Sequence, residues 1–205
     1  MTLYLLMQEE TKTTNSRKIM KDYVESYMKE TSKIAESLST TAMSDLISLI
    51  RHTKDAKGRI FFAGVGGSAA NASHAVNDFR KIAGVESHSL TENVAELTAR
   101  INDEGWDTSL VETLKVFNLS DRDILFVLSV GGGSQTTSLN LVKVMEFAKS
   151  QNMKICSIVS RNGGEAKKMS DVCVLVPVLA DDRITPHAEG FQAVIWHCIV
   201  NGIIK

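Results

Sequence analysis

The chain has 205 residues, of which 43% are hydrophobic and 23% are charged, the composition of an ordinary globular domain. Its formal net charge is −1, so no overall basic field favours nucleic acid or an anionic membrane as a partner. The apolar start MTLYLLM is too short to span a bilayer and has no basic flank, so we expect neither a signal peptide nor a membrane anchor.

The three cysteines, Cys156, Cys173 and Cys198, lie within apolar runs and form no CxxC pair. An odd number without framework spacing is typical of reduced, buried thiols, and it predicts a cytoplasmic protein. We expect each cysteine to act as a small core residue.

Hydrophobic spacing predicts that helices and strands alternate along the chain. Helix is expected over residues 16–52 with a break within 39–45, and Ser68 is expected to cap the helix that follows the first strand. The remaining expected helices are at 68–84, 93–103, 108–117, 131–152 (after a glycine turn), 163–170 and 185–204. The expected strands are at 59–65, 86–91, 123–130, 154–160 and 172–178.

The expected strands are continuous apolar runs, which is typical of a parallel sheet covered by helices on both faces. The predicted fold is therefore α/β and doubly wound. With two prolines and no Ser/Gly-rich linker, nothing marks a second domain. We expect a single domain over residues 16–205, preceded by an N-terminal tail, residues 1–15, either ordered or disordered.

Two glycine-rich loops follow expected strands, FFAGVGGSAA and FVLSVGGGSQTT. At the carboxyl end of a parallel strand, glycines let backbone N–H groups approach an anion, and the next helix adds partial positive charge. Neither loop matches GxxxxGK[ST] or GxGxxG, so a nucleotide is disfavoured. The hydroxyl groups of Ser68, Ser129, Ser134, Thr136 and Thr137 strengthen the prediction of a phosphate site.

Histidines and carboxylates recur at helical spacing on two of the expected helices. His74 and Asp78 stand at i and i+4, and Glu189 and His197 lie eight residues apart, near one face of the last helix. His197 lies in the apolar run AVIWHCIV, where a ring without a polar partner is costly, so it needs a metal or a carboxylate. The four residues are candidates for a metal site or a proton-transfer pair, although each pair alone also fits an ordinary contact.

The motifs GVGGSAANASH, NDEGW, LSVGGGSQTT and SRNGGEAKKMSDVCVLVP, in this order and spacing, resemble the sugar isomerase (SIS) domain family. The resemblance covers roughly residues 17–205 and is strongest to the phosphoheptose isomerases. It implies a flavodoxin-like αβα sandwich with an N-terminal helical extension, assembled as a homotetramer with active sites at subunit interfaces. It also implies conversion of sedoheptulose 7-phosphate to D-glycero-D-manno-heptose 7-phosphate.

The resemblance assigns roles to particular residues of this chain. It places phosphate on Ser129, Val130, Gly131 and Ser134, and sugar on Val65, Gly66, Gly67, Ser68, Glu92 and Asn93. It implies one zinc ion per subunit, bound by His74, Asp78, Glu189 and His197. Asp78 or Glu189 would be the base and His197 the acid of an enediol mechanism.

The sequence departs from the family pattern at three places. Val65 replaces the Asn of GNGGS, SVGGGS replaces STSGNS with the loss of hydroxyl and amide side chains, and Asp78 replaces a longer Glu. Two alternatives therefore stand beside the isomerase: a non-catalytic SIS module that binds a sugar phosphate or a protein, and an isomerase of another sugar phosphate.

Overall fold

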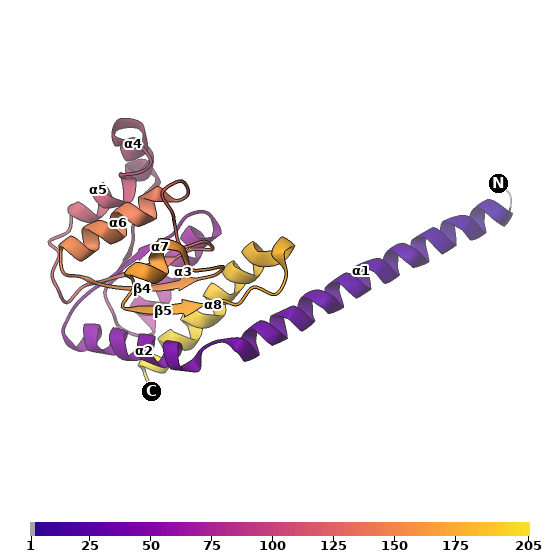
Figure 1. Ribbon diagram of the computed structural model, residues 1–205, viewed down its shortest axis with the longest axis horizontal. Helices are drawn as coiled ribbons and strands as arrows, with labels where there is room; N and C mark the ends of the chain where they lie inside the picture. The colour runs from indigo at the N-terminus through magenta and orange to yellow at the C-terminus, as the bar shows by residue number, and fades with distance from the viewer. Residues whose placement is uncertain (1–2) are drawn as a thin grey trace. The chain divides into compact units, whose positions relative to one another are not determined.

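The computed structural model describes the backbone of residues 3–205 and the side chains of residues 16–205. The predicted N-terminal tail, residues 1–15, therefore lies outside the residues described in full. The chain divides into two compact units, Met1–Ser37 and Leu38–Lys205. Helix α1 (Leu3–Ser37) forms the first unit, and the second unit contains the sheet (Figure 1).

Five parallel strands form one sheet in the order β2-β1-β3-β4-β5. This is the flavodoxin-like order, and it confirms the predicted doubly wound fold. The strands are β1 (Ile60–Ala63), β2 (Ser87–Ser89), β3 (Ile124–Leu128), β4 (Lys154–Val159) and β5 (Val172–Leu175). All residues of β1 and β3 are buried, as their unbroken apolar runs predict.

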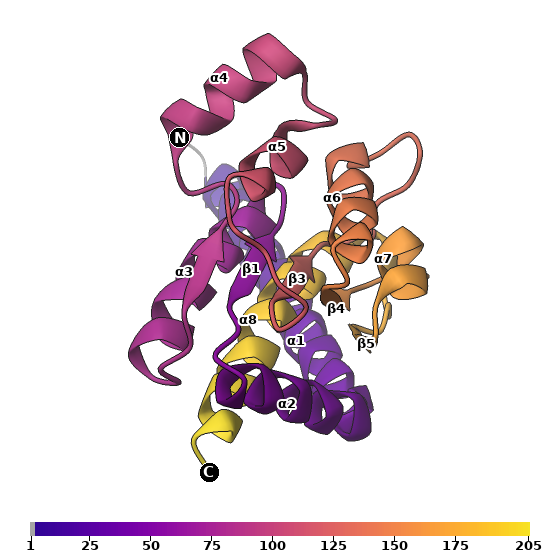
Figure 2. The ribbon, with the colours of Figure 1, turned by 90° about the vertical axis from the view of Figure 1, so that its left-hand side faces the viewer.

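Helices cover both faces of this sheet (Figures 1 and 2). One layer contains α2 (Thr40–Asp55), α3 (Gly67–Lys81) and α8 (Ile184–Ile203), with α8 packed on both of the others. The other layer contains α4 (Val94–Glu104), α5 (Ser109–Lys115), α6 (Leu139–Ser150) and α7 (Gly164–Met169). A 3₁₀ turn, η1 (Asp181–Arg183), precedes α8.

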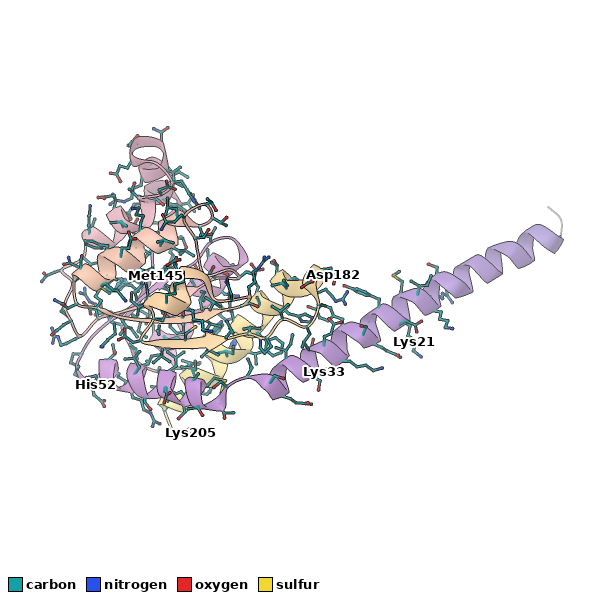
Figure 3. All side chains as sticks on the ribbon, in the orientation of Figure 1. Lys21, Lys33, His52, Met145, Asp182 and Lys205 are labelled. Atoms are coloured by element: carbon teal, nitrogen blue, oxygen red, sulfur yellow. The ribbon has the colours of Figure 1, made fainter. Side chains whose placement is uncertain are left out.

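Alternate side chains of each strand fill two cores. Phe61 and Leu125 face the layer of α5 and α6, where Met145 is fully buried (labelled in Figure 3). Phe62 and Phe126 face the opposite layer, and both rings contact Phe79 of α3. Burial on both sides holds the carboxyl ends of β1 and β3 in place, and the candidate site lies there.

Two expectations about single residues are wrong. Ser68 does not cap α3, because the helix begins one residue earlier and Gly66 is the capping residue. The glycine has a φ of 64°, which a serine would adopt only with strain. Cys198 is exposed, although Cys156 is buried and Cys173 half-buried, and all three are free thiols. Within the described residues, none of the helices is both long and apolar enough to cross a membrane.

Candidate active site

The two glycine-rich loops meet at the point where the chain reverses its direction of winding. From β1 the chain proceeds to β2 on one side, and from β3 it proceeds to β4 on the other. Because all strands are parallel, the loops after Ala63 and Leu128 leave the sheet at the same edge, side by side. Ligands of open α/β sheets bind at this switch point.

A cavity of about 420 Å³ opens between the two loops. No carboxylate is among the described residues that line it, and Arg161 is the only charged one. The lining residues are Val65, Ser68, Ser129, Val130, Gly131, Gly133, Ser134, Thr137, Ser138, Arg161 and Thr185. The cavity therefore offers hydroxyl and backbone groups together with one cation, a set that suits an anion.

Three serines in this cavity retain a hydroxyl proton for a ligand. Ser68 Oγ accepts a hydrogen bond from Gln192 Nε2 at 3.0 Å, and Ser129 Oγ accepts one from the amide of Gly132 at 3.0 Å. Ser134 Oγ accepts from the amides two and three residues later, at 3.3 and 3.1 Å. Each oxygen already accepts from the protein, so its O–H group can donate to a bound oxyanion; for Ser134 the Thr136 hydroxyl oxygen, 3.4 Å away, is an alternative acceptor.

The loop after β3 is held against the start of α7. The carbonyl oxygens of Gly132 and Gly133 accept hydrogen bonds from the amides of Ala166 and Glu165, at 2.9 and 3.0 Å. A trans peptide is planar, so the N–H group of Gly133 points away from α7, opposite to the carbonyl of Gly132. Gly133 lines the cavity, and its amide is thus a further donor for an anion there.

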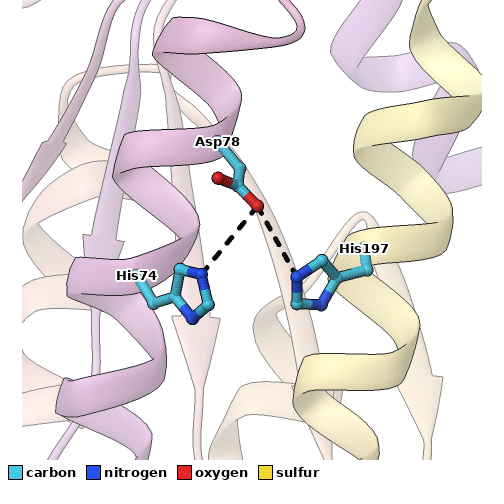
Figure 4. A group of neighbouring side chains, drawn as sticks. All are labelled: His74, Asp78 and His197. Atoms are coloured by element: carbon cyan, nitrogen blue, oxygen red, sulfur yellow. Dashed lines mark ion pairs between the residues drawn. The ribbon is translucent and has the colours of Figure 1, made fainter.

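A second cluster, His74, Asp78 and His197, joins α3 to α8 (Figure 4). Asp78 Oδ2 lies 4.0 Å from His74 Nε2 and 3.6 Å from His197 Nε2. One candidate ligand atom from each residue lies within 4.8 Å of the others. The two separations are too long for strong hydrogen bonds, and the group surrounds a position that a cation could occupy.

Neighbouring groups orient two of the three donors, His197 and Asp78. His197 Nδ1 lies 2.7 Å from the carbonyl oxygen of Ala193, which can only accept, so Nδ1 carries the proton and Nε2 presents its lone pair. Asp78 Oδ1 accepts from Asn77 at 2.8 Å, which leaves Oδ2 for the cluster. The Trp196 ring stacks on His197 with centroids 3.5 Å apart. Two imidazole nitrogens and a carboxylate oxygen fit zinc, and second contacts of this kind are typical of metal ligands.

The structure does not bring Glu189 into this three-residue group. Its carboxylate lies against Gly67, where an added β-carbon would collide with both oxygens. The side chain therefore rests at the N-terminus of α3, between the first glycine loop and α8, where the helix dipole favours a negative charge. A side chain at position 67 would displace the Glu189 carboxylate from this place.

Glu92 and Asn93 line a separate cavity of about 270 Å³ and are not among the lining residues of the first. Asn93 caps α4, since its side chain accepts a hydrogen bond from the amide of Glu96 at 3.1 Å. Gly66 borders a third cavity of about 240 Å³, which shares Val65 with the first. The sugar-contacting role of Glu92 and Asn93 thus stays a prediction.

Sequence reasoning missed four polar residues of the site. Gln192 is fully buried, and it donates to Ser68 while accepting from Asn71 Nδ2 at 2.9 Å, so it links α3 to α8. A buried polar residue in the apolar pattern of the last helix is the signal that could have identified it. Arg161 and Thr185 reach the cavity from the end of β4 and the start of α8. Arg161 lies within the motif SRNGGEAKKMSDVCVLVP, to which no binding role was assigned, and Thr185 has no neighbouring motif.

The fold and the cavity together define a doubly wound α/β domain with a polar binding site at its switch point. A family model described as the SIS domain matches residues 22–160, and the chain belongs to this family. The phosphoheptose isomerase of Helicobacter pylori (strain ATCC 700392 / 26695) is 30% identical over 169 residues, covering 79% of this chain and 82% of the relative.

A further relative and a solved structure are also similar to this chain over most of its length. A phosphoheptose isomerase of Aneurinibacillus thermoaerophilus is 28% identical over 192 residues and covers 88% of this chain and 91% of its own length. The structure of the phosphoheptose isomerase from Neisseria gonorrhoeae superposes with a TM-score of 0.78 at 23% identity, covering 90% of this chain and 98% of that one. That likeness supports the fold.

Proposed function

We propose that the protein is an aldose–ketose isomerase that converts sedoheptulose 7-phosphate into D-glycero-D-manno-heptose 7-phosphate. The chain is a sugar-phosphate isomerase by its relatives, which carry the name phosphoheptose isomerase and match most of its length. The observation that supports the proposal best is the pairing of a polar, carboxylate-free cavity with a His/Asp/His cluster on helices that border it.

The cavity between the loops would bind the phosphate. Ser129 and Ser134 supply hydroxyl donors, Gly131 and Gly133 supply backbone, and Ser68 adds a donor from the first turn of α3. His74 follows Ser68 by six residues, which is about 9 Å along a helix. The reacting end of a bound sugar phosphate would therefore extend along α3 toward the cluster.

The cluster would hold a zinc ion through His74, Asp78 and His197. When bound, such an ion polarises the sugar oxygens and stabilises the negative charge that develops in the reaction. Three protein ligands leave a position open for substrate, as catalytic zinc requires. Glu189 lies outside the three-donor group, so it is proposed here as the base rather than the fourth ligand.

Glu189 would remove a proton from one carbon beside the carbonyl group and return it to the neighbouring carbon, through an enediol. The hydroxyl proton needs a second group, for which His197 Nε2 is the candidate because Nδ1 is engaged by Ala193. One lone pair cannot bind a metal and a proton together. The isomerase activity of zinc-loaded protein, compared with that of chelated protein, therefore separates the role of His197 as a metal ligand from its role as an acid.

The test is to incubate the protein with sedoheptulose 7-phosphate at several zinc concentrations, and with a chelator, and to follow heptose 7-phosphate by NMR. Glu189→Gln should lower kcat by about 100-fold or more with little change in KM, because it removes the base. Glu146→Gln, on the surface of α6, is the matched control and should keep full activity. No heptose product at any zinc level contradicts the proposal.

A non-catalytic SIS module that binds a sugar phosphate or a protein is the second candidate function. Val130 and Gly131 bring no hydroxyl to the phosphate loop, and this favours weaker binding of the phosphate or binding of a different ligand. An isomerase of another sugar phosphate is favoured by the same two residues. Metal analysis separates the module from the enzymes, since a metal-free, inactive protein with a tight partner would be a module. A panel of sugar phosphates identifies the preferred sugar.

We also propose a homotetramer with active sites at its interfaces. The side chains of His74 and His197 are 59% and 45% exposed, although an isomerase site excludes water. Val194, one turn before His197, is 54% exposed.

Light scattering should give the mass of four chains, and Val194→Glu should lower both mass and activity. Val116→Glu, at the C-terminal end of α5 where Val116 is 64% exposed, should change neither, and a single-chain mass for the active wild-type enzyme would refute the tetramer.

A further inference from the structure

Arg161 is the only cation among the described residues that line the 420 Å³ cavity. It follows β4 and Ser160, at the same edge of the sheet as the two glycine-rich loops. Within the part of the chain that the structure describes in full, its guanidinium forms neither a hydrogen bond nor an ion pair. Most arginines at this protein's surface are engaged: Arg59 and Arg100, for example, bind carboxylates.

The backbone holds Arg161 in a conformation that costs energy. Its φ is 55°, in the left-handed region where a β-carbon is unfavourable and glycine is the usual residue. The turn is closed by a hydrogen bond from the amide of Gly163 to the carbonyl of Ser160 at 2.9 Å. The backbone is strained here because an arginine stands where glycine would fit more easily, and this points to a role for the arginine side chain.

The turn that carries Arg161 is fixed to the loop that carries the serines. The amide of Ser160 donates to the carbonyl of Val130 at 3.0 Å, and its hydroxyl donates to Val176. An added β-carbon on Gly132 would collide with the carbonyl oxygen of Gly163, so the two backbones touch. Arg161 is therefore positioned relative to Ser129 and Ser134 by backbone contacts rather than by its own side chain.

We propose that Arg161 binds the phosphate of the substrate and makes the cavity selective for a doubly charged anion. A guanidinium presents paired N–H donors that match phosphate oxygens, and such charge-assisted bonds are about twice as strong as neutral ones. Arg161 would thus supply contacts to the phosphate that Val130 and Gly131, which have no hydroxyl group, cannot make. The inference rests on the proposed function only in taking the phosphate to belong to a sugar.

Binding of inorganic phosphate to the full-length protein, measured by calorimetry, tests this without any turnover. Arg161→Ala should weaken phosphate binding at least about tenfold. The phosphate affinity of Arg161→Lys should lie between those of the wild type and Arg161→Ala, since lysine keeps the charge and loses the paired N–H donors of the guanidinium. Lys167→Ala, a change to a neighbouring basic residue outside the cavity lining, should bind as the wild type does. Arg161→Gly removes the side chain and relieves the strain of the positive φ together. This variant should therefore be at least as stable as the wild type and still bind phosphate more weakly.

Kinetics then separate this inference from the proposed function. With sedoheptulose 7-phosphate, Arg161→Gly should raise KM at least about tenfold and leave kcat within about threefold; a purely structural role would not split the constants in this way. Phosphate binding that depends on Arg161 in a protein without isomerase activity would leave the inference standing and remove the function. Wild-type protein that binds no phosphate, or an active Arg161→Gly enzyme with unchanged phosphate affinity, would overturn the inference.

Discussion

Asp78 is the residue on which the candidate metal site depends, because both imidazoles approach one of its oxygens. The carboxylate is buried, and Asn77 engages its other oxygen. Oδ2 itself has no short contact among the described groups around it, because both ring nitrogens lie 3.6 Å or more away, and a cation would supply one. The shorter Asp in place of Glu therefore suits a ligand held close to the helix, and Glu189 is left to reach the sugar.

Replacement of Asp78 by Asn should abolish tight zinc binding. Loss of an outer contact to a metal ligand already costs 10–100-fold in affinity, so loss of the ligand itself should cost more than about 100-fold. The measurement is zinc content by mass spectrometry after loading and dialysis, with chelated wild type as the baseline. His52→Ala, an exposed histidine of α2 labelled in Figure 3, is the control and should retain all the metal. Equal zinc in wild type and Asp78→Asn would show that the metal, if any, binds elsewhere.

At the scale of elements, the site depends on the crossing of two loops. The loop after β3 and the start of α7 approach so closely that only glycine fits at positions 132 and 164. The same crossing directs the carbonyls of Gly132 and Gly133 into α7 and the amide of Gly133 away from it. The donors of the cavity are thus a consequence of how β3 and β4 are connected to their helices.

Two glycine substitutions distinguish backbone strain from loop crossing. Gly66 and Gly132 both have positive φ, 64° and 75°, but an added β-carbon meets nothing within 4 Å at Gly66 and meets the carbonyl of Gly163 at Gly132. Gly66→Ala should therefore cost about 1–3 kcal/mol of unfolding free energy, the backbone penalty of its positive φ alone. Gly132→Ala should cost about 2–5 kcal/mol, because overpacking adds to that penalty. Urea unfolding measures both, and equal losses would argue against the crossing.

At the scale of the whole molecule, the sequence was sufficient for the sheet and partly sufficient for the site. Continuous apolar runs identified β1, β3, β4 and β5, because a strand buried on both faces admits few polar residues, whereas β2 is Ser-His-Ser and has no such run. His74, Asp78 and His197 were predictable from helical spacing, since α3 and α8 present them on facing sides. Arg161 and Gln192 were placed by contacts between segments far apart in the chain, which no local pattern encodes. Helical spacing also indicated Glu189, but its position against Gly67 depends on such a contact. For that reason the sequence alone could not assign the fourth ligand position or the cation of the cavity.

The edge of the sheet opposite the cavity is held together by Asp123. This carboxylate is almost fully buried and accepts hydrogen bonds from the Arg59 side chain, at 3.1 and 2.8 Å, and from the amides of Arg59 and Ser120, at 2.8 and 2.9 Å. Burial alone would raise the pKa of Asp123, but these hydrogen bonds and the Arg59 charge outweigh it and hold the pKa below its ordinary value. Arg59 and Asp123 precede β1 and β3, so the pair fixes the amino ends of the two central strands.

The Arg59–Asp123 pair should make the free energy of unfolding depend on pH in the acid range, without affecting the candidate active site. Because the folded-state pKa is lowered, the stabilisation is complete above the unfolded value of about 3.9 and is lost as the pH falls through the folded value. Asp123→Asn should cost about 3 kcal/mol near pH 7, since it leaves the Arg59 charge uncompensated, and the difference from wild type should shrink as the pH falls through the lowered folded-state pKa of Asp123. Urea unfolding between pH 2 and 8 measures it, with exposed Asp45→Asn as the control. A difference that stays constant across this range would mean that the carboxylate charge contributes nothing, and that Asp123 acts through its shape and neutral hydrogen bonds alone.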